Sequence, residues 1–173
     1  FELRLHAQEL PLPAFGIDAA TRGQLVHAVL DQLYGELRDN GIHPAAPDAR
    51  PLVSGVVREC LQGRVPPTPL NRVLAELEGQ RLELLVHQLL DFEAARPAFR
   101  VAATEARLLV PLGSQELNLR VDRIDELEAG EQLVIDYKTG GQKSRSDWLG
   151  ERPAEPQLPL YAVGSGAQSV AYI

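Results

Sequence analysis

Three strand-like segments joined by two short loops constrain the fold of this chain more than any other feature. The segments are residues 99–112, 115–126 and 132–138. Gly113-Ser114 has the glycine-first pattern of a two-residue type II′ hairpin loop, and Glu128-Ala129-Gly130 fits a three-residue loop with glycine in the left-handed position. The pattern therefore predicts three consecutive antiparallel strands.

The two loops also determine which side chains of the strands face each other. They place Glu105 opposite Asp122, and Asp122 opposite Asp136, while Lys138 projects from the same face as Asp136. Two carboxylates about 4 Å apart repel by ~4 kcal/mol at an effective dielectric near 20, and a divalent cation removes that cost. Oxygen ligands predict Mg²⁺ or Mn²⁺, although a one-residue slip in register would dissolve the site.

Helical periodicity dominates the residues before Pro97. Apolar residues at positions 26, 29, 30, 33 and 37 predict an amphipathic helix over 18–38, with Asp18 or Thr21 as its N-cap. Further helices are expected over 51–62 and 70–95, within a helical insert of about 42–97, and again over 156–163, before a final strand from Ser169. The order predicts an α/β fold: helix, helical insert, three antiparallel strands, helix, strand.

Composition limits the class of protein. With 173 residues, 45% of them hydrophobic and 24% charged, the chain has enough apolar material for one ordinary core, and no apolar run approaches the ~18 residues of a membrane span. A net charge of -7 argues against a basic nucleic-acid coat but not against a local basic channel. Cys60 is the single cysteine, which favours a reducing, cytoplasmic setting. The ends suggest one domain, 1–173, excised from a larger protein.

The placement of lysine in the chain points to phosphodiester hydrolysis. Lys138 and Lys143 are the two lysines of a chain that otherwise uses arginine for positive charge. An ammonium beside metal-bound carboxylates can orient a water molecule or neutralise developing charge, while the metal polarises a phosphoryl oxygen. An arginine would substitute poorly, because its guanidinium is broad and never deprotonated.

Four blocks of sequence together resemble the RecB/AddB-type branch of the PD-(D/E)xK nuclease superfamily. They are Gly23-Gln-Leu-Val-His27, Asp122, Val134-Ile-Asp136-Tyr-Lys138-Thr-Gly140 and Gln157-Leu-Pro-Leu-Tyr161. Their order and rough separations agree with that branch over residues 22–161. The chain departs from the branch at Leu119, where the family often has glycine, and in the helical middle, which carries no matching motif.

The resemblance implies a restriction-endonuclease-like core, a central mixed sheet flanked by helices, and a divalent metal. Lys138 would be the catalytic lysine, and Glu105 would support the metal or the water. The metal ligands that the resemblance implies are His27, Asp122, Asp136 and the backbone carbonyl of Tyr137. Some members also carry four cysteines for an iron–sulfur cluster; with Cys60 alone, this chain is expected to lack one.

Two further groups of residues are candidates for contact with DNA. Gln157 and Tyr161 lie one helical turn apart and could hold phosphates or brace the site. Lys143, Arg145 and Trp148 belong to a locally basic loop that could form a DNA-facing lip, with Trp148 stacking on bases, or could be an ordinary connector. Asp125, on the other hand, is expected to pair with Arg123 or to face solvent.

The residues and the resemblance together predict a metal-dependent DNA nuclease. An exonuclease acting in DNA repair or recombination is expected, and the resemblance implies helicase-type domains or subunits as partners. Any ATP-driven unwinding must come from elsewhere in the protein or from a partner, because the sequence contains no phosphate-binding loop. One alternative is an inactive nuclease-fold module that binds DNA or docks a helicase. Another keeps the hydrolase but makes RNA or a small nucleotide its substrate.

Overall fold

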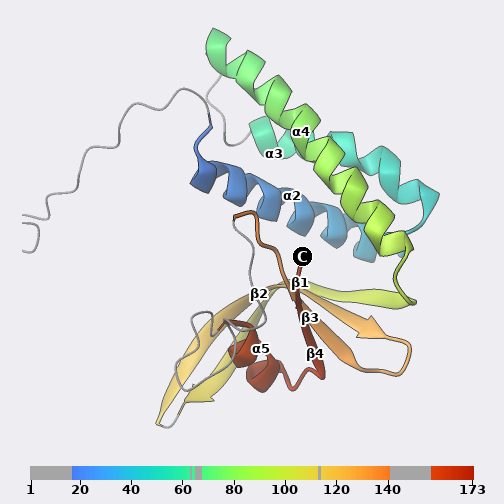
Figure 1. The fold of residues 1–173 in the computed structure, drawn as a ribbon, viewed down its shortest axis with the longest axis vertical. Coiled ribbons are helices and arrows are strands. Elements are labelled where there is room, and N and C mark those ends of the chain that lie inside the picture. Colours follow the sequence, from blue (N-terminus) through green and yellow to red (C-terminus); the bar gives the residue numbers. More distant parts are fainter. Residues whose placement is uncertain (1–16, 63, 65–67, 113, 141–156) are drawn as a thin grey trace, which may run out of the picture.

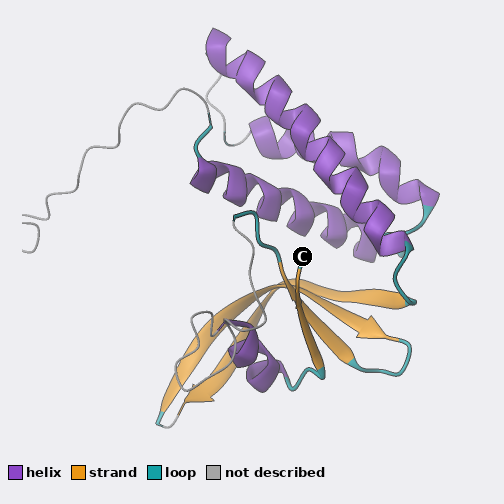
Figure 2. Cartoon of the chain, in the orientation of Figure 1, coloured by secondary structure: helices purple, strands orange, loops and turns teal. Residues whose placement is uncertain are grey.

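The computed structural model describes residues 17–62, 64, 68–112, 114–140 and 157–173. Three helices form a layer on one side of a four-stranded sheet, and a short helix lies on the other side (Figures 1 and 2). The predicted α/β class, with a mixed sheet flanked by helices, is confirmed. The elements are α2 (Ala19–Asp39), the 3-10 helix η1 (Pro47–Leu52), α3 (Val53–Gln62), α4 (Pro69–Ala94), β1 (Phe99–Leu112), β2 (Gln115–Leu127), β3 (Gln132–Asp136), α5 (Gln157–Ser165) and β4 (Ser169–Tyr172).

The sheet has the strand order β1-β2-β3-β4, in which β3 and β4 are parallel and the other pairs are antiparallel. The predicted hairpin registers are both confirmed. Leu112 pairs with Gln115 across the first turn, and Arg123 pairs with Ile135 in the second hairpin. The antiparallel order requires only short loops, whereas the parallel partner β4 arrives after α5, as a parallel pairing needs a crossover.

Local sequence accounts for the helix boundaries. Asp18 caps α2 by accepting the Thr21 N–H at 2.8 Å, so the N-cap is Asp18 rather than Thr21. Thr68 caps α4, with Pro69 at the first helical position, where a missing N–H costs least. The single helix predicted over 51–62 is wrong at its start: η1 contains Pro51, and α3 begins after it, because proline cannot donate into the α-helical ladder.

Two apolar cores lie on the two faces of the sheet. The larger core joins α2, η1, α3 and α4 to the sheet residues Phe99, Val101 and Ile135 and to Tyr137, directly after β3. The smaller core packs Leu158 and Tyr161 of α5 against residues of β2 and β3. The sheet is therefore covered on both faces, by the helical layer on one and by α5 on the other.

The first strand is irregular at two places. Its register with β2 shifts between Val101 and Ala103, and Glu105 has a φ of 48°, the left-handed region that non-glycine residues rarely adopt. The flanking pairs, Thr104 with Arg123 and Ala106 with Val121, still bracket Glu105 opposite Asp122, as predicted. The local turn of the backbone therefore redirects this carboxylate without breaking the hairpin.

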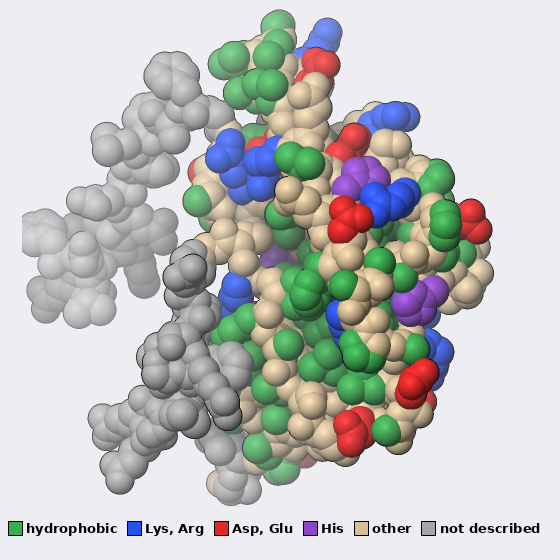
Figure 3. Space-filling view, turned by 45° about the vertical axis from the view of Figure 1, so that its right-hand side comes forward, with side chains coloured by type: hydrophobic (Ala, Val, Ile, Leu, Met, Phe, Trp, Pro, Cys, Tyr) green, Lys and Arg blue, Asp and Glu red, His purple; other side chains and the backbone are tan. Residues whose placement is uncertain are grey.

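The outer surface of α4 carries large exposed apolar side chains. Leu70, Val73 and Leu77 lie in its first half, and hydrophobic side chains cover the upper end of the molecule in Figure 3, where this helix begins. In the described part of the chain, no helix has the length and apolarity needed to cross a membrane.

Candidate metal and catalytic site

The site begins where the pairing of β2 with β3 ends. The ladder runs from Glu126 and Gln132 to Arg123 and Ile135. Just beyond it, the Tyr137 N–H donates a 2.7 Å hydrogen bond to Oδ2 of Asp122, so a side-chain carboxylate continues the contact between the strands. The orientation of Asp122 is thereby tied to the backbone immediately after Asp136.

His27 reaches this carboxylate from α2. Its Nδ1 lies 3.2 Å from Oδ1 of Asp122. One turn earlier, a Cβ on Gly23 would come within 3.2 Å of the Thr139 hydroxyl, so glycine allows the helix to approach the segment after β3 closely. The hydrogen bond to Asp122 raises the pKa of His27 against the opposing effect of burial, and the charges of Asp122, Asp136 and Glu105 add to the rise.

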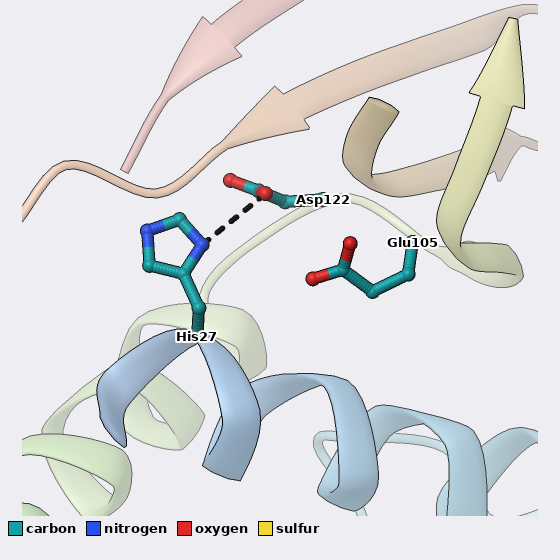
Figure 4. Close-up of side chains that lie close together, drawn as sticks. All are labelled: His27, Glu105 and Asp122. Carbon is teal, nitrogen blue, oxygen red and sulfur yellow. Dashed lines mark hydrogen bonds and ion pairs between the residues drawn. The ribbon is translucent and has the colours of Figure 1, made fainter. Parts of the chain in front are cut away.

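Glu105 completes a compact group of ligand-type atoms. One such atom each from His27, Glu105 and Asp122 lies within 4.8 Å of the others, and Figure 4 shows the three side chains converging from a helix and two strands. Burial raises the pKa of Glu105, and the nearby Asp122 raises it further, although the paired Arg120 opposes the shift. Gathering two carboxylates here is costly in the absence of a cation.

Asp136 and Lys138 form an adjacent ion pair. Asp136 is buried, and its Oδ2 lies 2.7 Å from Nζ of Lys138. Burial raises the pKa of Asp136, as does the charge of Asp122, while Lys138 and His27 oppose the rise. The backbones of Asp136 and Lys138 are both hydrogen-bonded to Ile173, directly after β4. The parallel strand therefore holds this short segment in place.

Residues of α5 brace the lysine and β2. Lys138 Nζ donates to Oε1 of Gln157 at 3.0 Å, and the Gln157 amide donates in turn to the Tyr161 hydroxyl. The buried Tyr161 hydroxyl donates to the carbonyl of Arg120 at 2.5 Å. Of the two roles considered for Gln157 and Tyr161, this geometry favours bracing of the site over contact with phosphates.

A cavity of about 650 Å³ opens beside the compact group. His27, Glu105 and Asp122 lie at its wall, together with the cationic residues Arg64 and Arg120. Arg120 was not among the site residues predicted from the sequence; its position two residues before Asp122, on the same strand face, was the available signal. Lys143, Arg145 and Trp148 lie outside the described residues.

The donor set suits a hard divalent cation. Carboxylate oxygens are the ligands that Mg²⁺ and Mn²⁺ prefer, and one imidazole is compatible with Mn²⁺. Asp136 does not belong to the compact group of three; its carboxylate is held by Lys138. His27, Glu105 and Asp122 could hold the ion, with Asp136 close enough to influence the pKa of His27.

Comparison with known proteins identifies one family. The sequence profile of the PD-(D/E)XK nuclease superfamily matches residues 1–171. No curated protein matches the chain.

Proposed function

This chain belongs to the PD-(D/E)XK nuclease superfamily, which indicates a metal-dependent nuclease acting on DNA, and from this premise we propose that it is an exonuclease of the RecB/AddB type. The observation that carries the proposal is the convergence of His27, Glu105 and Asp122 beside the ion pair of Asp136 and Lys138. The four sequence blocks, in the order typical of that branch, support the assignment to exonucleases of the RecB/AddB type.

The proposed metal ligands are His27 and Asp122, with Glu105 beside them to bind the ion or support the attacking water. Asp136 and the carbonyl of Tyr137, which the resemblance implies as further ligands, would join them only if Asp136 exchanged its pairing with Lys138 for the ion. When bound, Mg²⁺ or Mn²⁺ supplies Lewis-acid polarisation of a phosphoryl oxygen and lowers the pKa of a bound water. Asp122 is already aimed by its bond to the Tyr137 N–H. Occupancy by a cation would offset the repulsion among the carboxylates, which is why these residues favour a metal.

Lys138 is proposed to act on the attacking water and on the developing negative charge. Its ammonium is fixed between Asp136 and Gln157, which leaves one of its three protons free to be donated to the attacking water or the developing charge. A donor held in place before reaction loses little free energy to reorganisation, so its interaction with the transition state is strong. Gln157 is a positioning residue in this proposal, because it touches Lys138 and not the reacting atoms.

The cellular role proposed for the chain is DNA repair or recombination. Unwinding would come from helicase-type domains or subunits, since no phosphate-binding loop is present in the sequence. Arg64 and Arg120 lie in the wall of the cavity beside the compact group and could contact a DNA backbone. The same wall carries Asp31, Glu105 and Asp122, so a bound cation would be needed to offset its negative charge.

Digestion of end-labelled DNA tests the proposal. Linear single-stranded and double-stranded DNA is incubated with Mg²⁺ or Mn²⁺ and compared with covalently closed circles of the same sequence. We expect cleavage of linear DNA from its ends and none of the circles, and we expect Lys138→Ala to lower the rate by at least about a hundredfold. Cleavage of circles at a similar rate would replace the exonuclease assignment with an endonuclease.

Matched variants separate loss of chemistry from loss of folding. Asp136→Asn is compared with Asp39→Asn, at the exposed C-terminal end of α2, and Lys138→Ala with Arg100→Ala, at the exposed start of β1. Both controls should retain full activity. A folded wild-type protein that binds Mn²⁺ and cleaves no DNA would favour the inactive binding module, and activity on RNA alone would change the substrate class.

A further inference from the structure

A buried network of charges lies next to the proposed metal site without belonging to it. Arg123 is fully buried; its Nε and Nη2 donate to the two oxygens of Asp125, each at 2.6 Å, and its Nη1 donates to Glu93 at 2.7 Å. Arg96 also donates to both carboxylates, at 2.5 Å to Glu93 and 2.9 Å to Asp125. Two guanidiniums thus balance two carboxylates, and every contact is charge-assisted.

Stability of the core alone does not explain why these four charged side chains are buried together. Burying charges carries a desolvation penalty that ion pairing often only repays, so well-packed apolar residues would stabilise a core equally well. Here the charges join separate elements: Glu93 lies near the end of α4, Arg96 follows that helix, and the other two residues lie on β2. The geometry of the helical layer relative to the sheet is therefore specified at this point.

Tyr137 connects this network to the metal site. Its hydroxyl accepts a 3.4 Å hydrogen bond from Nη1 of Arg123. Its ring stacks on Tyr34 at 6.5 Å and meets the His27 ring edge-on at 6.1 Å. Its N–H holds Asp122. One buried tyrosine thus contacts two of the three residues of the compact group while its far end rests on Arg123.

Position along the chain strengthens the connection. Arg123 directly follows Asp122 on β2, and Tyr137 directly follows Asp136 at the end of β3. The guanidinium of Arg123 also lies 4.0 Å from the centre of the Tyr34 ring, and the hydroxyl of Tyr34 donates a hydrogen bond to Glu93. Fixing the side chains of Arg123 and Tyr137 therefore fixes the backbone from which both site aspartates project.

We propose that Arg123 is a positioning residue for the metal site, acting through Tyr137 with Glu93 and Asp125 as its anchors. Arg123 holds the Tyr137 side chain so that the tyrosine N–H and ring keep Asp122 and His27 in a geometry ready for a cation. The inference rests on the proposed function for the existence of that site, and it adds a dependence of metal affinity on residues that never contact the ion.

Calorimetric titration of Mn²⁺ into the folded chain of 173 residues tests the inference independently of nuclease activity. Tyr137→Phe removes only the hydroxyl that Arg123 contacts. Arg123→Met with Asp125→Asn removes one charge of each sign and leaves Glu93 paired with Arg96, so that no buried charge loses its partner. We expect both proteins to bind Mn²⁺ about tenfold or more weakly, the usual effect of losing an outer-shell partner of a metal ligand. Leu82 is buried about three turns before Glu93 on α4, and Leu82→Ala should lower the stability of the protein while its Mn²⁺ affinity is unchanged.

Three outcomes would overturn the inference, and Asp122→Asn distinguishes the first two. If Asp122→Asn loses Mn²⁺ binding while the folded Tyr137→Phe protein binds as tightly as wild type, the metal site stands and the positioning role of Arg123 is refuted. If Asp122→Asn binds Mn²⁺ like wild type, the proposed metal site itself is wrong, and the inference falls with it. Equal weakening of Mn²⁺ binding in Leu82→Ala would likewise refute a specific role for Arg123.

Discussion

Gly164, near the end of α5, gives the sharpest test of how the small helix is packed. A Cβ at this position would overlap Cγ2 of Val110 and come within 3.3 Å of its Cβ, well inside the ordinary contact distance of about 3.5–4.0 Å. Val110 is buried, and its branched side chain is stiff at χ1, so a rotamer change cannot relieve the overlap. Gly164→Ala must therefore displace α5 from β1.

The change in unfolding free energy expected for Gly164→Ala is the balance of two opposing effects. Overpacking of a core site typically costs about 1–3 kcal/mol, whereas replacing a helical glycine by alanine gains about 0.5–1 kcal/mol. We expect Gly164→Ala to lower the free energy of unfolding by about 1–2 kcal/mol, with an unchanged urea m-value. Gly35→Ala in α2, where nothing lies within 4 Å of the added methyl group, should instead stabilise the protein by about 0.5–1 kcal/mol.

A double-mutant cycle with Val110→Ala checks the physical cause. Removing the two methyl groups of Val110 makes room for the new one, so Gly164→Ala should be neutral or slightly stabilising in the Val110→Ala background. Urea denaturation of the four proteins gives the coupling free energy, expected at about 1–3 kcal/mol. A Gly164→Ala protein as stable as wild type, or a coupling near zero, would refute the packing described for α5.

Three further predictions concern the site and the buried charges. Mn²⁺ at about a hundredfold its dissociation constant should raise the free energy of unfolding by about 2.7 kcal/mol in wild type and leave Asp122→Asn unchanged, as measured by thermal or urea unfolding. Gln157→Leu should lower kcat by roughly tenfold to a hundredfold through misplacement of Lys138, yet should have no further effect in a Lys138→Ala background; additive losses would exclude a role through the lysine. Burial alone would raise the pKa of Glu93, but Arg123 and Arg96 hold it below its ordinary value of 4.5. The ionised residue therefore stabilises the fold above pH 4.5, and this contribution is lost as the pH falls further. Glu93→Gln should flatten the acidic part of the plot of unfolding free energy against pH, and an unchanged plot would contradict the pairing.

Much of the fold could be predicted from the sequence because it depends on local physics. Helical periodicity and a capping aspartate located α2, and two loops of known length determined both hairpin registers. The registers then placed Glu105 opposite Asp122 and brought Asp136 near them, since side chains alternate along strands. The Gly23 to His27 spacing also carried information, because a glycine one turn before the histidine lets α2 approach Thr139.

The grouping of side chains within the site was decided only by the tertiary structure. The left-handed backbone of Glu105, the holding of Lys138 by Gln157 and the burial of Arg123 each depend on elements that are distant in the sequence. An arginine with aspartates close by on its strand, as Arg123 has in Asp122 and Asp125, carries no local signal that tells a buried ion pair from an exposed one. Periodicity and loop length act over a few residues, whereas the partners of a buried charge come from whichever helix packs on the strand, and that is known only once the layers are assembled.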